Sequence, residues 1–233
     1  MQRALGFMVG VSVLAAVACS SGSGAPPQGQ ATRFAIATVQ FEQNATDGDV
    51  EVVFEVKGGN DGLTSLTVTA PDGRTVVSAT SPDTSTMGVR QYRFESPEPT
   101  DVPRLQKAYP EGVYRFVATT ARGARYSSEA TLSHRLPPGV TGIAPADEAK
   151  NVQVRGLRIS WTAVPDVASY IVAIEQPALG FNLSVTLPGS ATSFAVPDGV
   201  LRAGQSYTLA IGAVARGGNA SYVETSFATA AGN

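Results

Sequence analysis

The sequence is poor in the side chains that most often carry out chemistry in proteins. Its 233 residues include one cysteine and one histidine. A single cysteine excludes an internal disulfide, and one histidine is too few for a typical zinc site. Charged residues make up only 15% of the chain and the formal net charge is −2, so the composition provides no basic surface for nucleic acid.

Motifs for catalysis are equally scarce. The only imidazole that could act as a general base is His134, and its neighbour Ser133 would point to the opposite face of a strand. The sequence contains no glycine-rich phosphate loop, no metal triad and no paired-carboxylate motif. We therefore interpret His134 as a surface residue near a domain junction. We predict no catalytic residue, no metal site, no cofactor and no enzymatic activity.

A hydrophobic run without charge occupies residues 5–18, after the positive charge of Arg3. A membrane-spanning helix needs about 18 or more apolar residues, so this run is too short and is typical of a signal peptide. Small residues close it at Ala16 and Ala18, directly before Cys19. This arrangement resembles the lipobox of bacterial lipoproteins. The resemblance implies cleavage before Cys19 and lipid, such as palmitate, on that cysteine.

The residues after Cys19 suit a membrane tether. Residues 20–30 are rich in Ser, Gly, Pro and Gln, and we expect them to be flexible. We predict a signal peptide over residues 1–18, and a lipidated N-terminus with its tether over residues 19–33. Each buried CH₂ of an acyl chain contributes about 0.8 kcal/mol, so several chains would anchor the protein durably. Ser20, rather than an aspartate, follows the cysteine, which in Gram-negative lipoproteins resembles the pattern for the outer membrane.

The rest of the chain alternates between apolar and polar residues with the period of two that indicates β-strands. Turn residues such as Asp-Gly, Pro-Asp-Gly and Gly-Gly-Asn recur about every ten residues, which is typical of antiparallel β-sandwiches. Only residues 102–109, with Pro103 near the start, favour a helical turn. The predicted strands are 34–41, 50–56, 66–69, 75–78, 89–95, 112–119, 125–134, 157–162, 168–174, 182–187, 192–196, 206–215 and 220–229.

The sequence Leu-Pro-Pro-Gly at residues 136–139 interrupts this alternation. Two consecutive prolines favour a short, stiff linker. The predicted fold is all-β, with two tandem antiparallel β-sandwiches over residues 34–136 and 137–233.

The second predicted sandwich carries a recognisable series of residues, namely Ile159, Ser160, Trp161, Val164, Pro165, Tyr170, Leu201, Gly204 and Tyr207. Over residues 138–230 this series resembles a fibronectin type III domain. In that family a Leu-x-x-Gly-x-x-Tyr corner bonds its tyrosine hydroxyl back to the backbone, which the resemblance implies for Tyr207. It also implies that Trp161, Tyr170 and Leu201 are structural core residues. The family has no catalytic residues in common.

An internal repeat extends this interpretation to the first half of the chain. Tyr114 is followed by Arg122-Gly after 8 residues, and Tyr207 is followed by Arg216-Gly after 9. Such a repeat implies two copies of one hairpin. We therefore predict an Ig-like sandwich for residues 34–136, with Tyr114 in its core.

Oxygen-bearing side chains gather at a predicted turn. Asn44, Asp47 and Asp49 could hold Ca²⁺ through oxygen ligands. However, Asp47-Gly is also an ordinary choice for a hairpin turn, and no EF-hand pattern is present. A plain turn is the favoured interpretation, and a calcium site is the alternative.

Aromatic residues of the first sandwich raise the question of sugar stacking. Aromatics on predicted strands usually belong to the core. Phe181, in the predicted loop after Pro177, is a separate candidate for an exposed aromatic. The aromatics of the first sandwich are Tyr92, Phe94, Tyr109, Tyr114 and Tyr126.

These features together predict a lipid-anchored protein of the cell envelope. With an anchor, a tether, two sandwiches and no catalytic group, we expect a non-enzymatic binding module. Its partner would be a protein or polymer of the envelope, and the membrane would be reached through lipid on Cys19. The alternatives are a structural spacer or accessory subunit of an envelope assembly, and a carbohydrate-binding lipoprotein.

Overall fold

The computed structural model describes residues 31–81, 89–97 and 101–232. The predicted signal peptide, Cys19 and most of the tether lie outside these residues, so their assignment stays a prediction. Within the described ranges, no helix is long and apolar enough to cross a membrane.

The first half of the chain forms two facing sheets. Strands β1–β2–β5 make up one sheet, and β4–β3–β6–β7 make up the other. The short helix α1 has Asp101 as its N-cap, whose carboxylate accepts the Arg104 N–H at 3.2 Å, and a proline in its first turn. The elements are β1 (Ile36–Asn44), β2 (Val50–Lys57), β3 (Leu63–Thr69), β4 (Thr75–Thr80), β5 (Gln91–Glu95), α1 (Val102–Ala108), β6 (Gly112–Thr120) and β7 (Arg125–Leu132).

The second half repeats this plan. Strands β8–β10–β13 face β12–β11–β14–β15, and β9 pairs with β15. The elements are β8 (Thr141–Ala144), β9 (Ala149–Val152), β10 (Arg158–Thr162), β11 (Val167–Gln176), the 3₁₀ turn η1 (Pro177–Leu179), β12 (Phe181–Pro188), β13 (Ser193–Ala195), β14 (Ser206–Ala215) and β15 (Ala220–Thr229).

Alternate side chains of the strands fill two separate apolar cores. In the first core, Val39 and Phe41 of β1 belong to the same buried cluster as Phe116 of β6. Leu136 packs against this first core, whereas Val140 belongs to the second. The predicted fold class, all-β with two sandwiches, is therefore confirmed.

The two sandwiches share one topology. In the first, β6 pairs with β3 and β7, and in the second, β14 pairs with β11 and β15. The hairpins that carry Tyr114 and Tyr207 are thus equivalent, as the sequence repeat predicts. Both tyrosine hydroxyls bond to nearby backbone. Tyr114 Oη donates to Pro110 O at 3.0 Å, and Tyr207 Oη accepts the Arg202 N–H at 2.8 Å.

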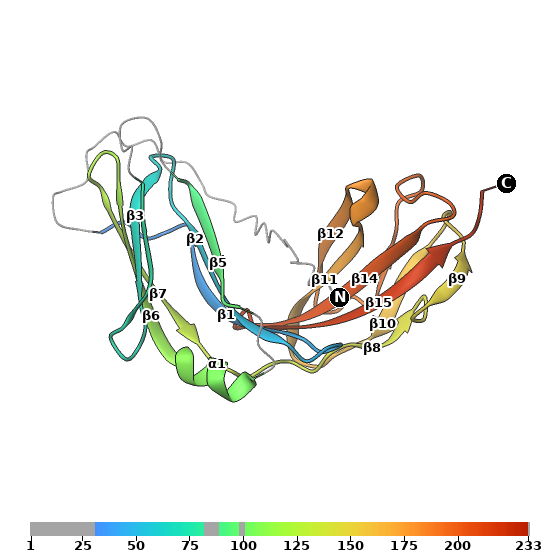
Figure 1. The fold of residues 1–233 in the computed structure, drawn as a ribbon, viewed down its shortest axis with the longest axis horizontal. Coiled ribbons are helices and arrows are strands. Elements are labelled where there is room, and N and C mark those ends of the chain that lie inside the picture. Colours follow the sequence, from blue (N-terminus) through green and yellow to red (C-terminus); the bar gives the residue numbers. More distant parts are fainter. Residues whose placement is uncertain (1–30, 82–88, 98–100, 233) are drawn as a thin grey trace.

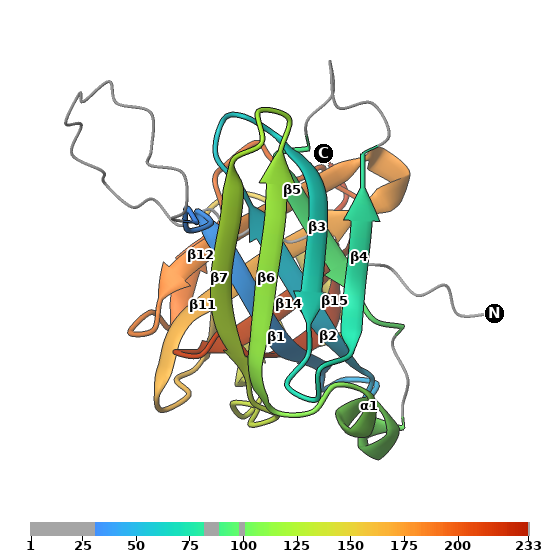
Figure 2. The same ribbon diagram turned by 90° about the vertical axis from the view of Figure 1, so that its left-hand side faces the viewer.

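The two sandwiches also share a sheet, which the sequence does not predict. β1 pairs with β15 in parallel, through Glu42 with Ala220, Gln43 with Ser221 and Asn44 with Tyr222. This pairing joins the strands in the order β12–β11–β14–β15–β1–β2–β5, which we call the inner sheet. The molecule is bent, and the inner sheet lines the inside of the bend (Figure 1). The sheet β4–β3–β6–β7, called the outer sheet, lies on the outside of the bend and faces the viewer in Figure 2.

Asn219 holds this junction in place. It follows Gly218, whose φ of 96° favours glycine, in the turn between β14 and β15. Its Oδ1 accepts the Phe41 N–H at 2.9 Å, and its Nδ2 donates to Ser133 O at 2.8 Å and to Arg135 O at 2.9 Å. One buried side chain of the second half therefore bonds to three backbone groups of the first half.

The structure departs from the predicted elements in a few places. β8 and β9 were not predicted, because four-residue strands are too short to show a clear period of two. The two parallel pairings, of β1 and of β9 with β15, add to the antiparallel arrangement. The strand predicted over residues 125–134 ends at Leu132, and the helical turn predicted over residues 102–109 is present as α1.

Candidate functional site

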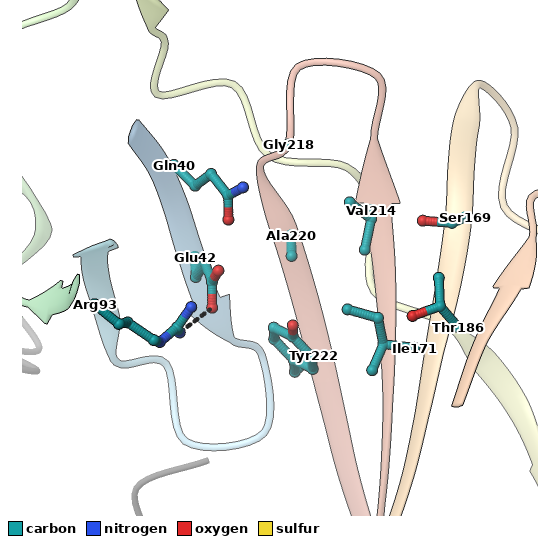
Figure 3. Close-up of a pocket in the computed structure, with 10 residues that line it drawn as sticks. All are labelled: Gln40, Glu42, Arg93, Ser169, Ile171, Thr186, Val214, Gly218, Ala220 and Tyr222. Atoms are coloured by element: carbon teal, nitrogen blue, oxygen red, sulfur yellow. Dashed lines mark ion pairs between the residues drawn. The ribbon is translucent and has the colours of Figure 1, made fainter. Parts of the chain in front are cut away.

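The inner sheet contains a hollow of about 210 Å³ at the junction of the two sandwiches (Figure 3). The first sandwich contributes Gln40 and Glu42 from β1 and Arg93 from β5. The second contributes side chains from β11, β12, β14 and β15, of which the most relevant are Ile171, Thr186, Val214, Ala220 and Tyr222.

Strand alternation places these side chains. Val39 and Phe41 of β1 point into the core, so Gln40 and Glu42 point to the opposite face, which is the inside of the bend. In β11, Tyr170 and Val172 point into the second core and Ile171 points to the hollow. Because β1 and β15 are neighbours in one sheet, the outward residues of both sandwiches meet at one place.

Glu42 is the most perturbed acid of this hollow. Its side chain is only 10% exposed, and Arg93 is its ion-pair partner at a distance of 3.9 Å. Loss of hydration on burial raises the pKa of Glu42 from 4.5 to about 7. The positive charge of Arg93 lowers the pKa, and the negative charges of Glu95 and Glu55 raise it, but these effects are smaller than that of burial. Carboxyl groups with such a pKa, set in a depression, are characteristic of functional sites.

Arg93 is shared between two acids. Its Nε donates to Glu95 Oε1 at 2.5 Å, and its guanidinium also faces Glu42. The Arg93 side chain is 23% exposed and lines the hollow, so it can also contact a ligand there. Sharing leaves Glu42 with a distant and partial countercharge.

Tyr222 lies on the surface of the inner sheet. It is the cross-strand partner of Gly212 in β14, and a β-carbon built on Gly212 would collide with the tyrosine ring. The missing side chain therefore makes the space in which the ring sits, a packing relation known between aromatics and glycines in sheets. Burial raises the pKa of the Tyr222 hydroxyl, and the charge of Glu42 raises it further.

The residues expected in the cores occupy buried positions. Tyr114 and Tyr170 are fully buried, and Tyr207 is 2% exposed. Trp161 is 4% and Leu201 5% exposed. The rings of Trp161 and Tyr170 pack at 5.2 Å, and the Tyr170 hydroxyl accepts the Val164 N–H at 2.7 Å.

His134 is a packed residue beside the junction. Its Nε2 lies 2.8 Å from Tyr109 O, and its ring packs on Phe41 at 5.1 Å. The expectation of a plain surface histidine is thus too simple, because the imidazole bridges β1 and the end of α1.

The acidic turn links β1 and β2. The Gly48 N–H donates to Asn44 O at 2.8 Å, and the Asn44 N–H donates to Asp49 O at 3.1 Å. Asn44 Nδ2 also donates to Asp47 Oδ2 at 3.4 Å, so these side chains have partners within the turn. In the ranges that the structure describes, no group of three or more His, Cys, Asp or Glu could hold a metal ion.

The aromatics considered for sugar stacking do not form one open face. Tyr114 is in the core, Tyr126 packs on Phe34 at 5.3 Å, and Tyr109 packs on Phe54 at 6.0 Å. Tyr92 and Phe94 stack on each other at 5.5 Å against the first core.

The expectation of an exposed aromatic at Phe181 is wrong. Its ring meets Tyr207 edge-on at 5.6 Å and packs against the second core. The reason is that Phe181 begins β12 rather than lying in a loop, so its side chain follows the alternation of that strand.

Sequence reasoning missed the residues of the hollow. Glu42 and Gln40 show the ordinary pattern of a solvated strand face, and Arg93 shows the same. The one signal in the sequence is Gly212 inside an otherwise apolar strand, since a glycine there often marks a close approach of another group.

No family model matches the sequence. Among solved structures, the chain is similar to the FN1–FN3 domains of chicken CNTN1, with 13% identity and a TM-score of 0.34 over 86% of this chain and 69% of that chain. A two-domain fibronectin type III segment of chicken tenascin gives 17% identity and a TM-score of 0.32. The match covers 82% of this chain and 97% of that chain. A tetra-tandem repeat from the extending region of a large adhesion protein gives 16% identity and a TM-score of 0.29. The match covers 82% of this chain and 48% of that chain. At these scores the likeness carries no argument about function, and the fold follows from the strand pairing described above.

Proposed function

We propose that this protein is a lipid-anchored interaction module of the cell envelope, and that the inside of the bend is its binding surface. The observation that carries the proposal is the joining of β1 to β15, which turns two sandwiches into one curved sheet with a hollow at the junction. Ligand sites are concave, occur preferentially between domains, and combine apolar surface with a few polar groups.

A fixed bend supports this role. Strand pairing and the bonds of Asn219 hold the two sandwiches in one arrangement before a partner arrives. A surface that is formed in advance loses less conformational entropy on binding than two freely jointed domains would.

The first described residues of the chain pair with the outer sheet rather than with the inside of the bend. Thr32 bonds to the edge of β7, where its N–H donates to Arg125 O and its C=O accepts the Ser127 N–H, both at 2.8 Å. The tether therefore joins the outer sheet, on the opposite side from the hollow.

Replacing the anchor residue tests the attachment. The Cys19→Ser protein should leave the membrane fraction while its thermal unfolding stays the same, because Cys19 precedes both sandwiches in the sequence. The measurement is cell fractionation with immunodetection, together with a melting curve. Cys19→Ser protein that still sediments with membranes would refute lipid attachment at this residue.

A matched pair of threonine substitutions tests the binding surface. Thr186 on β12 and Thr131 on β7 are both exposed, but Thr186 lines the hollow and Thr131 belongs to the outer sheet. Capture from a detergent extract of the envelope, with a chain starting at Ala31, should lose its specific partner with Thr186→Arg and keep it with Thr131→Arg. Equal capture by both variants would contradict the inside of the bend as the binding surface. It would favour the structural-spacer alternative.

A further inference from the structure

We propose that the hollow binds one ring of a neutral sugar polymer, with Tyr222 packing on the ring and with Gln40, Glu42 and Arg93 as partners for its hydroxyl groups. This inference rests on the proposed function, because it names a ligand class for the same surface.

The size of the hollow limits the ligand. Pockets for drug-sized molecules occupy about 300–1,000 Å³. A hollow of about 210 Å³ is smaller, and it is set in a sheet face that continues on both sides toward β5 and β12 (Figure 1). This shape suits a single ring of a longer chain, with the neighbouring units lying along the sheet.

The lining is divided into apolar and polar parts. Ile171, Val214 and Ala220 offer apolar surface, and the hydroxyl of Thr186 and the amide of Gln40 stand on opposite sides of it (Figure 3). A pyranose ring is divided in the same way, with C–H groups on its faces and hydroxyls around its edge. An apolar floor with a few convergent polar groups therefore matches a sugar better than a purely apolar ligand.

The charges of the hollow favour a neutral ligand. Glu42 and Arg93 both line it and lie 3.9 Å apart, so the hollow presents an acidic and a basic group side by side rather than one sign of charge. An anion would be repelled by the carboxylate of Glu42, and a cation would be repelled by the guanidinium of Arg93. Hydroxyl groups can both donate to the carboxylate and accept from the guanidinium, so a neutral polyol satisfies both groups.

Tyr222 supplies a positioned aromatic ring. The space above Gly212 fixes the place of the ring on the sheet, and the residue remains half-buried rather than enclosed. An aromatic ring held in this way loses little conformational freedom when a ligand packs on it, which is why tyrosine is frequent at binding surfaces. None of the aromatics singled out from the sequence has this setting.

The experiment uses the full chain in a detergent without a sugar headgroup. Cellopentaose, xylopentaose and maltopentaose are the neutral probes, and pentalysine and pentagalacturonate are the charged ones, each followed by saturation-transfer NMR and titration. At least one neutral probe should bind with a dissociation constant of about 1 mM or lower. Tyr222→Leu should weaken that binding by at least about tenfold. The matched variant Tyr126→Leu, at a half-buried tyrosine of the outer sheet, should bind normally.

Thr186→Arg gives a second variant in case Tyr222→Leu fails to fold, because Thr186 is exposed and its replacement obstructs the hollow without removing a packed ring. Binding of only the charged probes, or neutral binding that survives Thr186→Arg, would overturn the sugar assignment. If no probe binds but a partner is still captured in a Thr186-dependent way, the sugar assignment alone fails and the proposed binding surface stands.

Discussion

Replacing Asn219 with alanine is expected to lower the free energy of unfolding by about 3 kcal/mol. The substitution removes three hydrogen bonds to backbone groups and a fourth to Ser133 Oγ from a residue that is only 4% exposed. It leaves the Phe41 N–H without its acceptor, and the carbonyls of Ser133 and Arg135 without their donor. The Phe41 N–H is buried, and a buried donor that loses its acceptor costs about 1–3 kcal/mol; Ser133 and Arg135 are exposed residues, so water can replace part of what their carbonyls lose.

The same substitution should also change how the protein unfolds. Because Asn219 connects the two sandwiches, its loss weakens their coupling, and one cooperative transition should become two. Differential scanning calorimetry measures both effects, and small-angle scattering measures the expected widening of the distribution of shapes. A single transition within about 1 kcal/mol of the unchanged protein would contradict the role given to Asn219.

Asn182→Ala provides the matched control for this prediction. Asn182 lies exposed on β12 and donates to Glu175, so its side chain bonds within the second sandwich only. Because its acceptor Glu175 is only 8% exposed, loss of this single bond is expected to cost about 1 kcal/mol, well below the effect of Asn219→Ala. Calorimetry of the control should therefore show one transition close to that of the unchanged protein.

Local sequence patterns were sufficient to predict the sandwiches. The alternation in β6, β7 and β12 follows the pleat of a strand with one face turned to the core, and such a signal depends only on near neighbours in the chain. The repeat around Tyr114 and Tyr207 indicated equivalent hairpins, because each tyrosine has the same task of bonding a loop to the backbone.

The junction could not be predicted in this way. The bond from Phe41 to Asn219 spans 178 residues, and β1 pairs with β15 through only three residue pairs. Nothing in the residues around Glu42 distinguishes a strand that will receive a neighbour from one at a sheet edge. From the sequence pattern, Glu42 is expected to be an ordinary solvent-facing residue of a strand. It is buried because β15 pairs beside β1 in the shared sheet.

This difference explains why the candidate site escaped sequence reasoning. The sequence suggested the aromatics of the first sandwich and the acidic turn as candidate sites. The aromatics pack in or against the first core, and the polar groups of the turn bond to one another. The hollow depends on which outward residues face each other across β1 and β15, and this depends on long-range pairing. Its residue types are common on strand faces. Only the pairing of the two sandwiches buries Glu42 and brings it close to Tyr222.

Glu42 should make the stability of the protein fall as the pH rises from 4.5 toward 8. In the unfolded chain this carboxyl ionises near its ordinary pKa of 4.5, whereas in the folded protein its pKa is about 7. Between these values the folded protein keeps a proton that the unfolded chain has lost. Unfolding then releases a proton, so a higher pH favours the unfolded state. The difference in pKa corresponds to a loss of about 3 kcal/mol, complete once the pH exceeds 7.

Glu42→Gln separates this contribution from that of all other groups. Glutamine has nearly the shape of the protonated acid, so the variant should match the unchanged protein below pH 4.5 and exceed its stability by up to about 3 kcal/mol at pH 8. Glu129→Gln is the control, because Glu129 forms an exposed ion pair with Arg115, and such pairs contribute about 0–1 kcal/mol. Urea unfolding at several pH values gives the three curves. If the Glu42→Gln and unchanged proteins stay parallel from pH 4.5 to 8, the carboxyl is hydrated in the folded state, and the junction does not enclose it.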